Sequence, residues 1–444
     1  MEGLGGTHWW DVDLNLLTRD MGLSAMRIAV DRVPGNLSQL VAAGVKVVAS
    51  VWDPTISGAR KVAKADGGHL NPTDYGKYAD WIVNWIQNSP AQLYAFSPQN
   101  EPFFEPSYGG CIWTPQEMRD FLVVLSPKMD RCTRPCKIFW AENMVDRTFE
   151  NKPFLELACN DPVAKKHADA FAVHGYLSDG FTPGNTNAQL WAFYAKLCKQ
   201  YNVPLWQTEI SGFANSWTGA FELAENIYMA LRYGNVSLYT LWALNDGQGA
   251  VNEGYAVIAE GRPTSRFYAC AVMYRFIRPG AVRIKTVGGE NDLWTMAFWH
   301  PAENTLTLTF LNEGADKQVK LQGQLPSSFT VWRTSSGENC VQAGTVSPQN
   351  DITIKGNAIT TLHGTGYTPS VAVSPDPGRF EQRPGFGSGA LTVCGSRDAA
   401  PWWVLQLNGA SVGRGRHSTI VNGLFLDADV LRRRNGQAAV MIMR

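Results

Sequence analysis

Short apolar runs alternate with longer amphipathic stretches over residues 1–265. Each run has the length and the Val, Ala, Phe and Trp content of a buried strand, and the stretches between runs repeat apolar residues at helical spacing. Strands that alternate with helices form parallel sheets, and eight such units close a TIM barrel. We therefore predict an α/β fold with a (β/α)8 TIM barrel, whose strands span 2–7, 24–30, 45–51, 93–99, 137–141, 169–174, 203–208 and 236–243.

Start and stop signals support the predicted helices between these strands. Residues 73–87 place their apolar side chains on one face, and Pro72 stands at the start, where proline is favoured. Thr114 and Glu117 have the spacing of a capping box at the start of another helix. A third helix is predicted over 220–233, which a glycine follows.

The pattern changes after Pro279, where short, partly alternating runs are separated by polar turns. Such runs predict an antiparallel β-sandwich beside the barrel. The expected strands are 293–300, 305–312, 317–323, 329–334 and 358–364. We therefore divide the chain into the barrel at 1–265, the last barrel helix with the side β-domain at 266–368, and a linker and tail of unknown or non-native origin at 369–444.

The charge of the chain is balanced, with 39 Lys and Arg against 39 Asp and Glu in 444 residues. Because proteins that bind nucleic acid or anionic membranes carry basic surfaces, neither partner is expected. No apolar run reaches the roughly 18 residues that span a bilayer. The strand that begins directly after Met1 suggests a natural start further upstream. We expect a secreted monomer whose signal peptide is not present in this sequence.

The cysteine and histidine patterns predict neither a metal site nor a cofactor. The eight cysteines have no CxxC spacing, although their number permits disulfides. The seven histidines form no HxxxH or HExxH motif, and the early "GLGG" is not a dinucleotide-binding GxGxxG. No nucleophile elbow of a serine hydrolase is found either.

Two glutamates end apolar strands in the same way. Glu101 follows "LYAFSPQN" and Glu209 follows "VPLWQT", at the fourth and seventh predicted strands. Since barrel strands point their C-terminal ends at the active site, the two carboxylates should oppose each other. Glycoside hydrolysis needs one protonated and one ionised carboxyl group in that arrangement. Either glutamate alone would be interpreted as a salt-bridged strand end, whereas the pair favours catalysis.

The residues around both glutamates carry a family resemblance. "SPQNEP" and "LWQTEIS" resemble the acid/base and nucleophile motifs of the retaining barrel glycosidases, and within that clan the chain resembles glycoside hydrolase family 30. "RPTSRFYACAVMYRFIRPGAVRI" at 262–284 is similar to the helix that enters the family's side domain. The resemblance covers residues 2–366 and implies that Glu101 is the acid/base and Glu209 the nucleophile. The family's strand before the barrel, which joins the side domain, is not found.

Four further residues are candidates for the substrate site. Asn100, beside the acid/base, is expected to donate to the sugar 2-hydroxyl; capping the following turn is the alternative. Arg27 lies in an apolar strand and needs a carboxylate partner. We expect Glu209, whose pKa it would lower, with another acid at the barrel mouth as the alternative. His174 and Tyr176 are expected to hold Glu209 by hydrogen bonds, with a core role as the alternative for the histidine.

Three tryptophans are candidate platforms on which sugar rings stack. They are Trp52, Trp113 and Trp242, and the last of these, which ends the eighth strand, is the strongest candidate. The chain has 16 tryptophans, most of which should be core, so the other two are equally well interpreted as packing residues.

The resemblance is closest to the xylanase branch of the family. It implies a polysaccharide substrate and an endo-β-1,4-xylanase; the alternatives are a β-1,6-glucanase or galactanase, a glucosylceramidase-like β-glucosidase, and a non-catalytic carbohydrate-binding barrel. The family's glucuronate-dependent xylanases use an arginine after the eighth strand. Here no arginine follows that strand before Arg262, which puts glucuronate recognition in doubt.

Overall fold

The computed structural model describes residues 1–107, 109–180, 182–184, 187–245, 255–287 and 292–367, and the backbone of three short strands between 390 and 407. Two compact units divide at Pro279 and Gly280. The last barrel helix, α7 (Ser265–Tyr274), therefore belongs to the first unit rather than to the side domain, because it packs against α6 (Trp217–Arg232) and the π-helix Leu16–Met21. No helix in these described ranges is long and apolar enough to cross a membrane.

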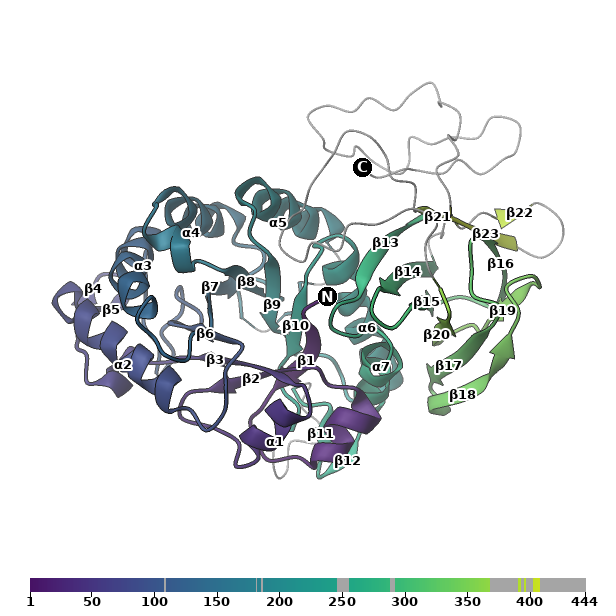
Figure 1. Ribbon diagram of the computed structural model, residues 1–444, viewed down its shortest axis with the longest axis horizontal. Coiled ribbons are helices and arrows are strands. Elements are labelled where there is room, and N and C mark those ends of the chain that lie inside the picture. The colour runs from purple at the N-terminus through teal and green to yellow at the C-terminus, as the bar shows by residue number, and fades with distance from the viewer. Residues whose placement is uncertain are drawn as a thin grey trace, which may run out of the picture. The chain divides into compact units, whose positions relative to one another are not determined.

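The first unit is a closed barrel of eight parallel strands, as predicted (Figure 1). Around the barrel the order is β1-β10-β9-β8-β7-β6-β3-β2. Short segments of small and branched residues form these strands because both faces are buried. Their bounds are β1 Gly3–Thr7, β2 Ala25–Ala29, β3 Lys46–Ser50, β6 Ala95–Ser97, β7 Lys137–Met144, β8 Ala170–His174, β9 Leu205–Glu209 and β10 Leu238–Leu241.

Helices surround the barrel strands (Figure 1). The capping box forms as predicted, since Thr114 Oγ1 accepts from the Glu117 backbone and the glutamate reaches back. Helix α6 begins three residues before the predicted start because Ser216 Oγ caps the Gly219 amide at 3.2 Å. The remaining helices are α1 Leu37–Ala42, α2 Tyr75–Asn88, α3 Pro115–Met129, α4 Thr148–Asn160 and α5 Ala188–Tyr201. An unpredicted hairpin, β4 (Lys61–Lys64) with β5 (Gly67–Leu70), lies between β3 and α2.

The barrel interior is packed below the active site. The carboxylate of Glu2 closes its lower end by accepting hydrogen bonds from Trp206 Nε1 at 3.0 Å, Ser237 Oγ at 2.9 Å and Lys137 Nζ at 2.7 Å. Cysteines of this unit are free thiols at positions 111, 132, 136, 159, 198 and 270. The interior cluster consists of Ala25, Val48, Ala95, Phe139, Ala170, Ala172, Trp206 and Leu238.

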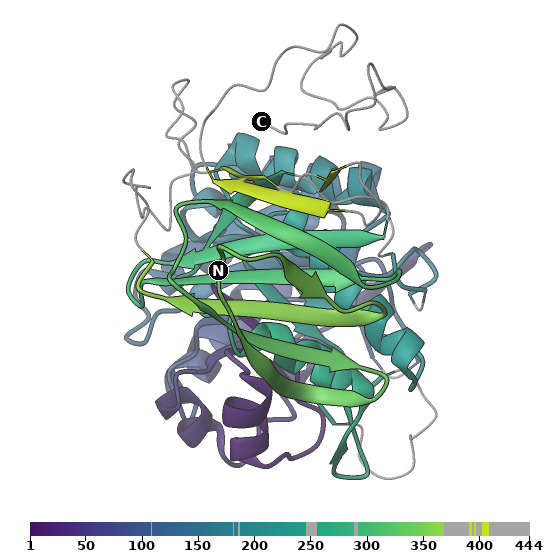
Figure 2. The same cartoon turned by 90° about the vertical axis from the view of Figure 1, so that its right-hand side faces the viewer.

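The second unit contains two sheets around an apolar core (Figure 2). One has the order β18-β17-β20-β15-β14-β13-β21 and the other β19-β16-β23-β22. The five predicted strands form within one residue of their expected ends: β14 Leu293–His300, β15 Thr305–Asn312, β16 Lys317–Gly323, β17 Phe329–Ser335 and β20 Ala358–Thr365. The unpredicted strands are β13 Val282–Val287, β18 Glu338–Val346, β19 Ile352–Ile354, β21 Ala390–Thr392, β22 Gly395–Ser396 and β23 Trp402–Leu407.

Candidate active site

Two nearly buried glutamates lie together at the carboxyl end of the barrel. Glu101 follows β6 and Glu209 ends β9, the fourth and seventh barrel strands. A carboxylate oxygen of each and a ring nitrogen of His174 all lie within 4.8 Å of one another. Carboxyl groups about 5–5.5 Å apart fit a covalent glycosyl intermediate, whereas about 6.5–9.5 Å leaves room for a water between them. The nearest oxygens of the two groups are at most 4.8 Å apart, which is compatible with the first mechanism.

The polar residues that end β6 form a bonded turn that presents Glu101. Gln99 Nε2 donates to the backbone oxygens of Trp52 and Asn100, both at 2.7 Å. Its Oε1 accepts from Trp113 Nε1 at 3.0 Å. Glu101 itself has a left-handed backbone with φ of 47°, which is rare for a residue other than glycine. Functional sites are where such strain is typically found, because the surrounding bonds hold it in place.

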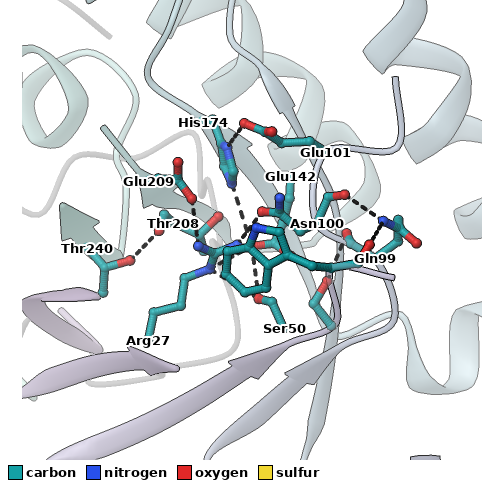
Figure 3. Close-up of polar contacts among 12 residues, drawn as sticks. Arg27, Ser50, Gln99, Asn100, Glu101, Glu142, His174, Thr208, Glu209 and Thr240 are labelled. Atoms are coloured by element: carbon teal, nitrogen blue, oxygen red, sulfur yellow. Dashed lines mark hydrogen bonds and ion pairs between the residues drawn. The ribbon is translucent and has the colours of Figure 1, made fainter. Parts of the chain in front are cut away.

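Arg27 on β2 is the centre of the polar network (Figure 3). Its side chain is fully buried. Nη1 contacts Glu209 Oε2 at 2.7 Å, while Nη2 donates to Asn100 Oδ1 at 2.6 Å. Nη2 also lies 2.9 Å from Glu142 Oε1, and Nε lies 3.1 Å from Ser50 Oγ. The guanidinium fork therefore holds the nucleophile candidate and the neighbouring amide in one fixed arrangement.

Glu142 is a third buried carboxylate that the sequence reasoning missed. It lies near the end of β7, at a register shift between Ala141 and Asn143, and its φ is 51°. Burial would raise its pKa, but the charge of Arg27 and the bond to His174 lower that pKa to about 2. The only available signal was an acidic residue directly after the predicted strand 137–141.

His174 contacts the acid/base candidate rather than the nucleophile candidate, which corrects our prediction. Its Nδ1 lies 2.9 Å from Glu101 Oε1, and its Nε2 lies 3.7 Å from Glu142 Oε1. The ring turns this way where the register of β8 against β9 shifts after Val173. Burial lowers the pKa of His174, yet the charge of Glu209 and the bonds to the other two acids raise it to about 9. The imidazole is thus a cation at neutral pH.

Tyr176 does contact Glu209, with its hydroxyl 3.4 Å from Oε1 and 2.8 Å from Ser211 Oγ. Arg27 acts to lower the pKa of this carboxylate, as predicted, but the net shift is upward. Burial raises the pKa of Glu209, and the charges of His174 and Arg27, which act to lower it, do not fully offset that burial. The nucleophile candidate therefore needs both cations to stay ionised.

Two predicted tryptophans belong to a half-buried aromatic cluster beside the carboxylates. The Trp52 ring lies 4.6 Å from the Arg27 guanidinium and 6.0 Å from the Trp242 ring. Trp9, which the sequence reasoning missed, packs 4.7 Å from the Trp242 ring. The exposed Arg32 guanidinium lies 3.9 Å from the Trp9 ring on the outer side. The cluster thus combines flat apolar rings with two guanidinium groups.

Trp113 is a core residue, which corrects its prediction as a stacking platform. Only 1% of its surface is exposed. Its ring packs against Tyr75 at 5.7 Å and Phe121 at 5.3 Å, and its indole N–H is bonded to Gln99. Trp113 therefore supports the turn before Glu101 from below, and does not face a ligand.

The cluster Glu101, His174 and Glu209 has ligand atoms close enough to reach one cation. Its chemistry fits a proton network better than a metal site. The histidine nitrogen is already bonded to Glu101, and a Glu209 oxygen is already paired with Arg27. A metal would have to displace two charge-assisted hydrogen bonds.

Comparison with known proteins confirms the resemblance drawn from the sequence. The barrel with its side β-domain is the fold found in structures of glycoside hydrolase family 30. The chain is 26% identical over 411 residues to the glucuronoxylanase XynC of Bacillus subtilis strain 168, covering 84% of this chain and 88% of the relative. No protein-family model matches.

Solved structures confirm the fold. A glycoside hydrolase family 30 subfamily 8 xylanase from Clostridium acetobutylicum superposes with a TM-score of 0.66 at 20% identity, covering 81% of this chain and 95% of its own. An endo-β1,6-glucanase superposes with a TM-score of 0.62 at 18% identity, covering 82% and 92%.

Proposed function

We propose that this protein is a retaining endo-β-1,4-xylanase that works by double displacement. The observation that carries the proposal is the separation of at most 4.8 Å between oxygens of Glu101 and Glu209. That spacing leaves room for a sugar ring to be attacked directly by a carboxylate. A non-catalytic sugar-binding barrel would not need either acid to be fixed at this separation.

In the first step Glu209 attacks the anomeric carbon while the glycosidic bond breaks. Its Oε2 is held by Arg27 at 2.7 Å, whereas Oε1 has a longer contact of 3.4 Å with Tyr176. We assign the attack to Oε1, because it can leave its weak contact without breaking the ion pair. Glu101 gives its proton to the leaving oxygen.

In the second step Glu101, now a carboxylate, takes a proton from a water that attacks the same carbon. The ester bond to Glu209 breaks and the product keeps the β-configuration. Before the first step, with Glu101 protonated, the carboxylates of Glu142 and Glu209 face two cations, Arg27 and His174.

Asn100 is assigned to the sugar 2-hydroxyl. Its Oδ1 already accepts from Arg27 at 2.6 Å, so its NH2 group is the part that can face the substrate. A donor held in place before the reaction strengthens its bond as charge develops in the transition state.

Xylan is the substrate that the similarity supports, since the curated relative is named a glucuronoxylanase. This chain has no arginine between β10 and Arg262 that could pair with a glucuronate. We therefore propose that it cleaves xylan without requiring that side group.

The proposal is tested by sugar release from glucuronoxylan, unsubstituted xylan and β-1,6-glucan, with Glu209→Gln as the blank. We expect both xylans to be cleaved at similar rates and the variant to be inactive. Cleavage of β-1,6-glucan alone would refute the substrate while leaving the mechanism intact. A folded protein that cleaves none of the three would refute the enzyme proposal.

We also propose that the protein acts outside the cell and as a monomer. An intact polysaccharide does not cross a membrane, so the enzyme must meet it outside. Fractionation of producing cells and the mass measured by light scattering test these two statements.

A further inference from the structure

A pocket of 230 Å³ lies on the helix layer and shares no residue with the active site. It is formed by the outer face and the C-terminal end of α2, by the residues that follow this helix, and by one residue of the segment after β2. We call it the α2 pocket. Its lining residues are Val33, Trp81, Asn84, Trp85, Asn88, Ser89 and Pro90.

Two tryptophans supply the apolar part of the α2 pocket. Trp81 and Trp85 are four residues apart on α2, so they share one face of the helix. Both are half-buried. Each is backed by another ring, because Trp81 stacks on Tyr78 at 6.2 Å and Trp85 packs on Phe96 at 5.6 Å. The indoles are therefore held in place before any ligand arrives, which lowers the entropy cost of binding.

Polar groups of the α2 pocket have capacity for a ligand. Asn88 Nδ2 donates to Asn84 O at 2.8 Å and to Asn84 Oδ1 at 2.9 Å. This pairing fixes the two amides and leaves the Asn84 NH2 and the Asn88 oxygen facing solvent. Ser89 is only 5% exposed, yet its Oγ has no hydrogen-bond partner among the described residues. Because this oxygen has almost no accessible surface, a ligand in the pocket meets the two amides and not the hydroxyl.

We propose that the α2 pocket is a second carbohydrate-binding site, which holds a sugar ring of an uncharged β-linked polysaccharide away from the catalytic residues. None of the seven lining residues is charged, so a neutral polyhydroxyl ligand is matched better than an acidic or basic one. Flat apolar rings beside exposed amides fit a pyranose, which has apolar faces and polar edges. The choice of ligand rests on the proposed function.

The size of the pocket supports a short contact with a longer polymer. Pockets that bury a whole drug-sized ligand occupy about 300–1,000 Å³, which is more than the 230 Å³ found here. A stable protein–protein interface needs roughly 1,000 Å² or more, which a pocket of this size does not provide. One ring of a bound chain would fill it, and the site would retain the enzyme on an insoluble substrate.

The test uses the full chain carrying Glu209→Gln, so that binding is measured without cleavage. Depletion from solution by insoluble unsubstituted xylan gives the association constant. We expect adding Trp81→Ala to lower it at least about fivefold. Phe149→Ala is the matched control, because this ring is 91% exposed on α4 and lies outside the pocket.

Asn84→Ala gives a second variant that tests the pocket with little risk to folding, because the residue is exposed. With Glu209 restored, Trp81→Ala should slow release from insoluble xylan while kcat/KM on short xylo-oligosaccharides stays unchanged. An association constant that neither pocket substitution lowers would overturn the inference, even if xylan is cleaved. A change of mass in light scattering with unchanged binding would overturn it in favour of self-association.

The experiment distinguishes failure of the second-site inference from failure of the proposed function. If Glu209→Gln binds xylan through Trp81 but the protein with Glu209 cleaves no xylan, the second site stands and the proposed function falls.

Discussion

Arg27 Nη1 and Glu209 Oε2 lie 2.7 Å apart, although the two residues are separated by 182 positions in the sequence. The pair joins the second barrel strand to the seventh across the barrel mouth. Because the same guanidinium also contacts Glu142, a single buried cation serves two carboxylates. The position of the nucleophile thus depends on a strand that carries no reacting group.

Two substitutions of Arg27 should distinguish the effect of its positive charge from the effect of its guanidinium geometry. Arg27→Lys keeps a cation but loses the fork, so we expect kcat to fall by about 100-fold or more with modest loss of stability. Arg27→Met also leaves Glu142 buried without its partner, which should cost about 3–5 kcal/mol of unfolding free energy. Steady-state kinetics and urea unfolding of both variants check this. A folded Arg27→Met variant with kcat within about threefold of the parent would contradict the role.

The stability of the protein should decline at alkaline pH through His174. The pKa of this residue is raised from 6.5 to about 9 in the folded state. Its contribution is therefore fully present below pH 6.5 and is lost as pH rises through 9, amounting to a few kcal/mol. Urea unfolding from pH 6 to pH 9.5 should show this fall, and His174→Gln should lack that part of it. Equal pH dependence in both proteins would be the contrary result.

The acidic side of the stability profile should depend on Glu142. Its pKa is lowered from 4.5 to about 2 on folding. A lowered pKa contributes stability that is present above pH 4.5 and lost as pH falls through 2. Glu142→Gln should therefore reduce unfolding free energy at pH 6 but flatten its dependence between pH 5 and pH 2.5. Parallel curves for variant and parent would show that the carboxylate is not the group responsible.

The hydroxyl of Tyr176 should matter for rate more than for binding. Tyr176→Phe removes the 3.4 Å contact to Glu209 and leaves the ring in place. We expect kcat to fall about tenfold with KM nearly unchanged, since the contact is longer than the best transition-state donors. Ser211→Ala serves as the comparison, because it removes only the partner at 2.8 Å on the other side. An equal loss of kcat in both variants would show that the hydrogen bond between Tyr176 and Ser211 matters, and not the contact of Tyr176 with Glu209.

Substitution of Trp113 by alanine should reduce stability, whereas the same substitution at Trp242 should weaken substrate binding. Trp113→Ala empties a fully packed site, so a loss of about 3–5 kcal/mol in unfolding free energy is expected. Trp242→Ala removes a half-buried ring of the aromatic cluster, so KM should rise while the melting temperature changes little. Thermal unfolding with kinetics on xylan checks both. A Trp113→Phe variant with raised KM and unchanged stability would restore the platform interpretation.

The barrel could be predicted closely because its signal is local. All eight strands fall within three residues of their expected ends, since each is a continuous apolar run buried on both faces. Two catalytic candidates could be predicted because Glu101 and Glu209 end strands with the same design. The partners of these two glutamates could not be predicted from the sequence. His174 contacts Glu101 because of the direction of its side chain, which lies at a register shift between β8 and β9.

Two features were out of reach for different physical reasons. Glu142 is turned toward Arg27 by a local irregularity in β7, and a period-two pattern cannot show such an irregularity. Trp113 stands just before α3, and only the packing of α2 and α3 around it decides that it is core. Strand β19 alternates but has only three residues, too few to give a signal by themselves, so its pairing with β16 defines it.

Alkylation of the buried free thiols of the barrel can measure when parts of the barrel unfold. Burial raises the pKa of Cys111 and of Cys270 to about 12, so these sulfurs are protonated and unreactive in the closed protein. An alkylating reagent can modify them only in molecules whose helices or strands have separated. Mass spectrometry of labelled peptides would therefore time the opening of the β6–α3 segment and of α7 independently, in the unmodified chain and without any engineered probe.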